Sequence, residues 1–249
     1  MSLPRLALLL LVTQLGAAQT PVPSFAVATI KPAAVSNDGH THITYPANDN
    51  FGASNITVAA LMQWAYGISE KQIVEGPPWL SSTRFDIQAK ADMGDRLKGL
   101  SSEQIKELKR RMVQGMLADR FHLRVHQETR SLPAYDLVLA KGGSKLIATQ
   151  SNGKSVNTGR RYFNGEGLTM ILISEELSQI SGRVVVDKTG LDGRYDVRLQ
   201  WTPDDVAASD NDAPTFFYAI QEQLGLKLES AKEPVPVLVI DHIEQPTPN

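Results

Sequence analysis

The 249-residue sequence contains no cysteine. This absence excludes disulfide scaffolds, thiolate zinc sites, iron–sulfur clusters and cysteine nucleophiles. An excess of one charge is also missing, because 25 basic side chains stand against 27 acidic ones and the formal net charge is −2. A nucleic-acid-binding protein would show a concentrated basic surface, so this balance argues against nucleic acid as a partner. The 42% of hydrophobic residues is typical of a globular protein.

A long hydrophobic run is missing as well, and the one apolar run near the start is short. Arg5 precedes an unbroken apolar stretch from Leu6 to Val12, and small residues follow at Gly16 to Ala18. This pattern predicts a signal peptide over residues 1–18, cleaved after Ala18. A spanning helix needs about 20 apolar residues, so we expect an exported protein, periplasmic or extracellular, with no stable membrane insertion after cleavage.

An internal repeat is the main organising feature of the sequence. Arg84-Phe85-Asp86-Ile87 recurs as Arg194-Tyr195-Asp196-Val197, each time within an alternating, strand-like run. Residues 121–139 also overlay residues 224–242 without a gap, which places Pro133 on Pro236. The repeat predicts two related halves, residues 19–145 and residues 146–249, which form either two domains or one compact unit.

Each half is expected to hold two helices. A Thr57 or Asn55 cap begins the first helix of the first half and Gly67 ends it, while Thr169 and Gly182 bound its counterpart. Ser101 and Gln104 form a capping box for the second helix of the first half. Its counterpart has Pro214 in its first turn, one apolar face and Gly225 just past its end. The residues expected on that apolar face are Phe217, Ile220 and Leu224.

The expected fold class is α+β, with two related halves and a mostly antiparallel sheet. Each half is interpreted as helix-strand-strand-helix-strand-strand, because the short links between strands favour hairpins over long crossovers. An extra strand is predicted over residues 25–31. Residues 31–54 and 202–212 are predicted to be exposed loops, and residues 142–167 a boundary between the halves, because turn residues are frequent there.

Two pairs of histidines suggest metal binding, but the sequence does not support a metal site. His40 and His42 lie two residues apart among turn residues, and His122 and His126 alternate with apolar positions, which predicts exposed side chains. A zinc site needs three or four converging ligands. We therefore predict no metal site and no cofactor.

Catalytic motifs are also incomplete. The string Asp187-Lys188-Thr189-Gly190-Leu191 matches the phosphorylated loop of P-type ATPases over only four residues, and its glycine turn between two strands favours a hairpin connection. No Gly-x-Ser-x-Gly string is present. The adjacent carboxylates Glu175-Glu176 and Asp204-Asp205 would diverge on a helix or lie in solvent. We therefore name no catalytic residue, and the ligand-binding residues are unknown from the sequence.

Two further strings have both a structural and a functional interpretation. Trp79, in the string from Gly76 to Leu80, could stack on a sugar or a peptide, but a large aromatic residue there is expected to plug the core near Trp64. The basic residues of the capped helix are interpreted as its solvent face. They are Lys106, Lys109, Arg110 and Arg111, with Glu103 and Glu107 between them.

Several strings of this chain, taken in order, resemble one family. The strings are Phe25 to Pro32, Trp64 to Gly67, Gly76 to Leu80, Arg84 to Ile87, Asp119 to Phe121, His126 to Arg130, Val186 to Leu191, Gly193 to Asp196, Leu224 to Glu229 and Ile240 to His242. The family that they resemble is an acidobacterial family of exported proteins of unknown function, and some relatives carry the domain behind a membrane metallopeptidase of the beta-lactam-sensor type. The resemblance implies no catalytic residue and suggests an extracytoplasmic sensing or binding role.

The sequence thus favours a non-enzymatic binding or sensing module that acts on an unknown cell-envelope ligand or protein partner. The alternative is an envelope hydrolase with a site between the two halves, assembled from distant residues. A purely structural partner in a secreted assembly would instead show an exposed apolar patch or an open sheet edge.

Overall fold

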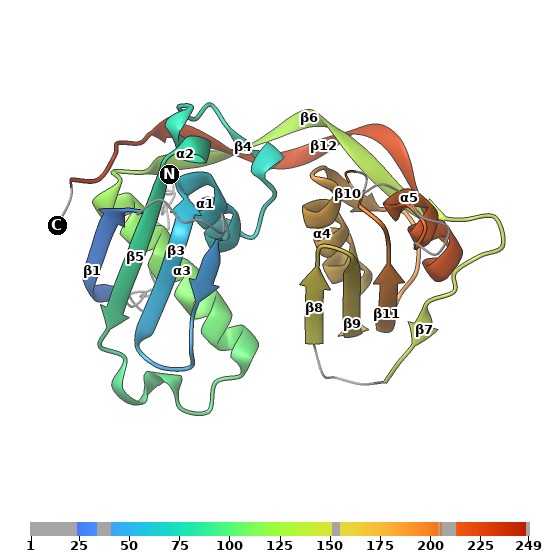
Figure 1. The fold of residues 1–249 in the computed structure, drawn as a ribbon, viewed down its shortest axis with the longest axis horizontal. Coiled ribbons are helices and arrows are strands. Elements are labelled where there is room, and N and C mark those ends of the chain that lie inside the picture. The colour runs from blue at the N-terminus through green and yellow to red at the C-terminus, as the bar shows by residue number, and fades with distance from the viewer. Residues whose placement is uncertain (1–23, 34–40, 151–154, 204, 206–212, 248–249) are drawn as a thin grey trace, which may run out of the picture.

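The computed structural model describes residues 24–33, 41–150, 155–203, 205 and 213–247. The predicted signal peptide, His40 and most of the 202–212 loop lie outside these residues. The fold is α+β with mostly antiparallel sheets, as predicted. Figure 1 shows two lobes joined by a long two-stranded ribbon. No helix within the described residues is long and apolar enough to cross a membrane.

The first lobe is built on a four-stranded antiparallel sheet in the order β1-β5-β3-β2. Its strands are β1 (Phe25–Pro32), β2 (His42–Thr44), β3 (Asn50–Thr57) and β5 (Arg84–Ala91). The helices α1 (Val58–Tyr66), α2 (Trp79–Ser82) and α3 (Ser102–Arg120) belong to the same lobe, with short 3-10 turns at Glu70–Gln72 and Gly94–Leu97. The predicted first strand is confirmed, but the predicted loop over residues 31–54 is wrong in part because it contains β2 and the start of β3.

The second lobe has its own four-stranded sheet in the order β7-β11-β9-β8. The strands are β7 (Ile147–Ala148), β8 (Ser155–Gly159), β9 (Tyr162–Leu168) and β11 (Tyr195–Gln200). The helices are α4 (Met170–Ser181) and α5 (Phe216–Ala219), and α5 continues as a π-helical turn over Ile220–Leu224. The segment expected to be a boundary, residues 142–167, therefore contributes β7, β8 and nearly all of β9 to this sheet. The side chains of β7 and β8, the two edge strands, are mostly exposed, whereas β9 lies inside the sheet and is partly buried.

The ribbon between the lobes consists of β6 (Arg124–Leu139) and β12 (Leu226–His242), which pair antiparallel along almost their whole length. The prediction of two strands after the second helix of each half was wrong, because each pair is one continuous strand. The partner of each strand lies about a hundred residues away rather than in a local hairpin. Short parallel strands complete this sheet: β10 (Val184–Asp187) lies beside β6, and β4 (Ile73–Val74) lies beside β12.

The connection from residue 187 to residue 194 corrects a second hairpin prediction. The turn chemistry is as expected, since Asp187 Oδ1 accepts from the backbone N–H of Thr189 at 2.9 Å, and Gly190 and Gly193 have φ of 69° and 111°. The strands on either side do not pair with each other. Strand β10 pairs with β6, whereas β11 pairs with β9 and β7, so the turn passes the chain from the ribbon into the second sheet.

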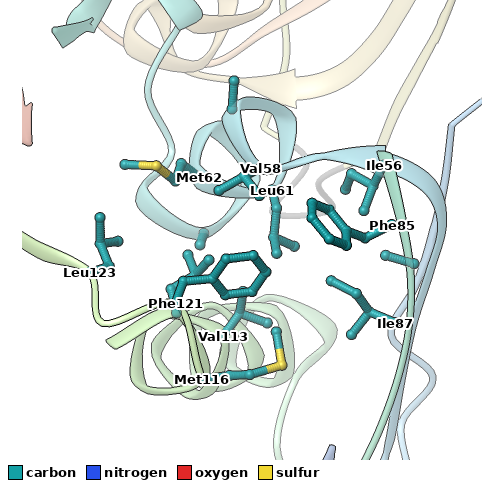
Figure 2. Close-up of a cluster of buried hydrophobic side chains, with 14 of the residues drawn as sticks. Ile56, Val58, Leu61, Met62, Phe85, Ile87, Val113, Met116, Phe121 and Leu123 are labelled. Carbon is teal, nitrogen blue, oxygen red and sulfur yellow. The ribbon is translucent and has the colours of Figure 1, made fainter. Parts of the chain in front are cut away.

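The two lobes have separate cores, and the ribbon contributes to both. In the first core, side chains from β3, β5, α1 and α3 pack together, and Figure 2 shows Phe121 beside Leu61 and Val113. Leu238 and Ile240, from the C-terminal end of β12, belong to this same core. Leu137, from the C-terminal end of β6, belongs to the second core with Phe163 and Ile173. Each long strand therefore begins in one lobe and ends in the other.

The predicted caps of α1, α3 and α4 are confirmed, but Pro214 lies before the Thr215 cap of α5 and not in its first turn. The Thr57 hydroxyl accepts from the Ala60 N–H at 3.2 Å, the Thr169 hydroxyl accepts from the Leu172 N–H, and Ser101 and Gln104 form the capping box. Apart from α2 and the short 3-10 and π-helical turns, the order of elements from β3 to β6 recurs from β9 to β12. That the two halves derive from one repeated unit, with a division near residue 145, stays a prediction.

The repeated Arg-aromatic-Asp string has the same structural role in both lobes. The Asp86 carboxylate accepts from the Asn55 N–H at 2.9 Å, and Arg84 donates to the Asn55 carbonyl at 2.6 Å. In the second lobe, Asp196 and Arg194 bind the N–H and the carbonyl of Gly167 at 2.9 and 2.8 Å. Each Arg-Asp pair thus holds a left-handed residue, with φ of 54° at Asn55 and 64° at Gly167, just before a helix cap.

One residue of the expected solvent face is buried. Lys109 has no exposed surface, because it lies between Ile105 and Met112 at the edge of the apolar face of α3. Its ammonium group donates to the carbonyls of Asn48 and Asn50 at 2.8 and 3.1 Å. Burial lowers the pKa of this ammonium group, and the nearby Asp49 carboxylate opposes that effect. Lys109 therefore fastens the turn between β2 and β3 to α3.

Replacing Lys109 tests this anchoring role. We expect Lys109→Met to lower the free energy of unfolding by about 2 kcal/mol, because two hydrogen bonds from a charged donor are lost while the aliphatic part of the side chain is kept. Urea unfolding measures the change. The matched control on the same helix is Arg111→Met, whose exposed ion pair with Glu107 is worth only about 0.3–0.5 kcal/mol. Equal stabilities of the two variants would contradict the assignment.

Candidate functional site

A hollow between the lobes is the candidate functional site. Its volume is about 580 Å³. In the first lobe its wall is formed by α1, α3 and Tyr45, and in the second lobe by α4, Leu168 and β8. The side chains that carry the argument are Trp64, Lys106, Arg110, Val156, Glu175 and Glu176. The sequence had suggested a site between the halves only as an alternative and had named no residue for it.

The aromatic part of the hollow lies on the first lobe. Trp64 is half-buried near the end of α1, where one side of its ring system packs on Phe51 at 5.3 Å between ring centroids. Tyr45 lies at the same distance from Trp64. An indole held between two rings has little freedom, and its remaining surface faces the hollow. This rigid, partly exposed aromatic surface is a suitable contact for a bound molecule.

The charged parts of the hollow differ in sign between the lobes. On α3, Lys106 and Arg110 are half-buried, and Arg110 Nε is buried without a hydrogen-bond partner in the described structure. On α4, Glu175 is exposed and Glu176 accepts from the Thr158 hydroxyl at 3.2 Å. The expectation that two adjacent carboxylates diverge on a helix is not met in full, because both line the same hollow. A bound molecule would meet cations on one wall and anions on the other.

The groups in the hollow that are able to take part in acid–base chemistry are Lys106, Glu175 and Glu176. Its described lining contains no histidine, cysteine or aspartate, and Ser102 supplies its one aliphatic hydroxyl. A nucleophile needs an adjacent base within hydrogen-bond reach. Amide side chains add neutral donors and acceptors: Gln63 lines the first wall, and Gln179 Nε2 reaches across to the Ile68 carbonyl at 3.5 Å.

A second polar cluster lies on the ribbon, outside the hollow. His126 Nδ1 is 2.9 Å from Asp241 and its Nε2 is 3.1 Å from Glu128. Glu128 also accepts from Arg130 at 2.8 Å, and Arg130 donates to Glu75 at 2.6 Å. The hydrogen bonds to Glu128 and Asp241 raise the pKa of the His126 imidazole. Both imidazole nitrogens contact carboxylates, so the cluster favours the protonated form of His126 and ties β6 to β12.

The raised pKa of His126 predicts a pH dependence of stability. A histidine whose pKa is higher in the folded chain stabilises the fold below its unfolded pKa of about 6.5, and this contribution is lost as the pH rises through the folded value. The difference in free energy of unfolding between the wild type and His126→Gln should therefore shrink from pH 5.5 to pH 8.5. An NMR titration of the imidazole should give a midpoint above 6.5 that falls in Glu128→Gln. A midpoint unchanged by that substitution would contradict the assignment.

The remaining sequence candidates are placed as follows. His42, His122 and His126 are exposed, as predicted for those within the described residues. No group of three or more metal-binding side chains occurs among the described residues. Trp79 is half-buried against the first core, whereas its neighbour Leu80 is 5% exposed. Trp79 and Leu80 therefore together fill the place in the core that was expected of Trp79 alone. Phe217, expected on the apolar face, is 45% exposed, and Phe216 is buried in its place.

The residues of the hollow were missed because no local pattern marks them. Trp64 belongs to a string already singled out, and Lys106 and Arg110 to the basic helix, but their proximity to α4 depends on how the ribbon places the two lobes. An i,i+4 pair such as Lys106 and Arg110 on one helix face is a weak signal by itself, because such pairs are common on solvated faces.

Comparison with known proteins gives a family and no activity. Neither the search of curated proteins nor the search of solved structures found a match. A family model described as "Protein of unknown function (DUF3738)" matches residues 59–243, which include α1, α3, α4, the ribbon and both Arg-Asp pairs. This match covers well over half of the chain, and the chain therefore belongs to the DUF3738 family of proteins of unknown function.

Proposed function

We propose that the protein is an exported, non-enzymatic binding or sensing module that takes a cell-envelope ligand, or a segment of a partner protein, into the hollow between its lobes. The observation that carries the proposal is the hollow itself, where a rigid aromatic surface lies beside walls of opposite charge. Such a combination of apolar contact with a few oriented polar groups is typical of ligand sites.

Export is supported by the pattern of residues 1–18. The resemblance to domains found behind membrane metallopeptidases of acidobacteria agrees with a role outside the cytoplasm. N-terminal sequencing of the protein recovered from the periplasm or the medium tests this part. The expected first residue is Gln19, and recovery of the intact chain in the cytoplasm would overturn it.

Binding is favoured over hydrolysis by the location of the titratable groups. His126 and Asp136, whose pKa values are raised, lie on the ribbon and not in the lining of the hollow. An enzyme would be expected to place such groups in its cleft. The alternative of an envelope hydrolase would have to draw its acid, base or nucleophile from Ser102, Lys106, Glu175 and Glu176, the groups of this kind in the described lining of the hollow.

Titration of the chain from residue 19 tests the binding proposal. Trp64 fluorescence reports on the hollow. The Trp64→Phe variant separates the fluorescence of Trp64 from that of Trp79 and Trp201. We expect one member of a panel of glycans, peptidoglycan fragments and envelope extracts to change the Trp64 signal saturably, without release of a product. Turnover of a fragment would favour the hydrolase, and a panel without effect would count against the proposed function.

A further inference from the structure

One wall of the hollow carries an open sheet edge. Strand β8 lies at the end of the second sheet, and its one strand partner among the described residues is β9. Four of its five residues are exposed, and Val156 lines the hollow with 46% of its surface accessible. In Figure 1, β8 is the strand of the second lobe nearest to α3 of the first. Its unpaired backbone groups form a template for a further strand.

The charges around this edge specify what kind of strand would fit. Lys106 and Arg110 attract carboxylates. Glu175 and Glu176, from the helix beside β8, attract ammonium or guanidinium groups. Successive side chains of an extended strand point to opposite sides, so one short peptide can present acidic and basic groups in two directions at once.

We infer that the ligand is an extended peptide of mixed charge that adds to β8 as an extra strand and contacts Trp64 with an apolar side chain. This inference rests on the proposed function and names its ligand class. Backbone hydrogen bonds to β8 supply affinity, and the charged walls select the sequence, as in other cases of strand addition. A neutral glycan would use neither the charged walls nor the ladder of N–H and C=O groups along β8.

The experiment compares three probes by Trp64 fluorescence at low salt. The first is a synthetic octapeptide in which Glu and Lys alternate and one Val replaces a central residue, so that acidic and basic side chains point to opposite sides. The second is the same peptide with alternate backbone nitrogens methylated, and the third is a chito-oligosaccharide. We expect the first probe to bind saturably and the second at least tenfold more weakly, because methylation removes the backbone donors and keeps the charges. The third probe should not change the signal.

Charge-reversal variants test whether the charged side chains on the two walls of the hollow bind the peptide. Lys106→Glu combined with Arg110→Glu should weaken the octapeptide at least tenfold, whereas Lys141→Glu, an exposed change outside the hollow, should not. Adding Glu175→Lys and Glu176→Lys to the first pair should restore binding of the peptide whose Glu and Lys are exchanged. Thermal unfolding of each variant checks that it is folded, and the restored binding separates lost recognition from lost structure.

The outcomes distinguish the inference from the proposed function. Equal binding of the methylated and unmethylated peptides overturns strand addition. Binding of the oligosaccharide at Trp64 without any binding of the peptide overturns the peptide class and leaves the hollow as a ligand site. If no probe and no panel member changes the Trp64 signal, both the inference and the proposed function fail.

Discussion

Removing the last 14 residues, from Pro236 onward, is expected to unfold the first lobe, although that lobe is built mainly from the N-terminal half of the chain. The deleted segment includes four consecutive buried residues, from Val237 to Ile240, with exposures of 2–6%. Burying one such side chain stabilises a fold by about 1.5–3 kcal/mol, so the loss is about 6–12 kcal/mol. This loss equals the whole stability of a typical domain, which is about 5–15 kcal/mol.

The second lobe is expected to survive this truncation. Leu226 and Leu228, at the start of β12, remain and belong to the second core. Limited proteolysis followed by mass spectrometry should therefore cut within residues 25–120 and spare residues 155–200. The control is a chain that ends at Glu244, because Glu244 N–H donates to the Phe121 carbonyl at 2.8 Å and the strand remains whole. Protection of the first lobe in the shorter chain would show that β12 contributes little to it.

Each of the two long strands, β6 and β12, begins in one lobe and ends in the other. This arrangement explains which parts of the fold could be predicted from the sequence. The helices could, because their caps at Thr57, Thr169 and Ser101 are hydrogen bonds within three residues. The strand-like runs at residues 84 and 194 could too, because alternation is local. The pairing of the strands could not be predicted, because β6 pairs with β12 and β10 pairs with β6, and long stretches of chain separate the members of each pair.

The prolines of the ribbon also show that a local sequence pattern does not reveal the partner of a strand. The ungapped overlay placed Pro133 on Pro236, and in the structure both lie just before the segment that pairs with a short parallel strand. Proline cannot donate to a ladder and so occurs at free edges of a sheet. The overlay also places Tyr135 on Leu238, which pair with Val185 and Ile73 respectively. The pattern was visible, but its meaning depends on partners that sequence periodicity does not reveal.

The candidate site was less predictable than the fold. Its walls come from α1, α3, α4 and β8, and no two of these were expected to meet across the halves. Lys109 and Arg110 illustrate the difficulty, since they are neighbours on one basic helix. The first is fully buried under a turn, and the second lines the hollow. Two adjacent positions on one helix therefore have different roles, because Lys109 anchors a turn and Arg110 faces the hollow.

The Arg-Asp pairs should be the most important polar contributions to stability in both lobes. We expect Asp86→Ala and Asp196→Ala each to lower the free energy of unfolding by about 1.5–3 kcal/mol, because each removes a carboxylate from a part-buried N–H. The two sites lie in different lobes without shared partners, so their effects should add in the double variant to within about 0.5 kcal/mol. Urea unfolding measures the three values, and Asp92→Ala, an exposed change, is the control.

The residue held by each pair provides a sharper test. Asn55 and Gly167 both adopt positive φ, which glycine and asparagine tolerate and β-branched residues do not. Asn55→Gly and Gly167→Asn should therefore cost less than about 1 kcal/mol, whereas Gly167→Val should cost more than either. If Asp86→Ala and Asp196→Ala left stability unchanged but abolished a binding signal, the repeated string would be part of a ligand site. If the predicted order holds, its recurrence follows from a backbone requirement that both lobes share.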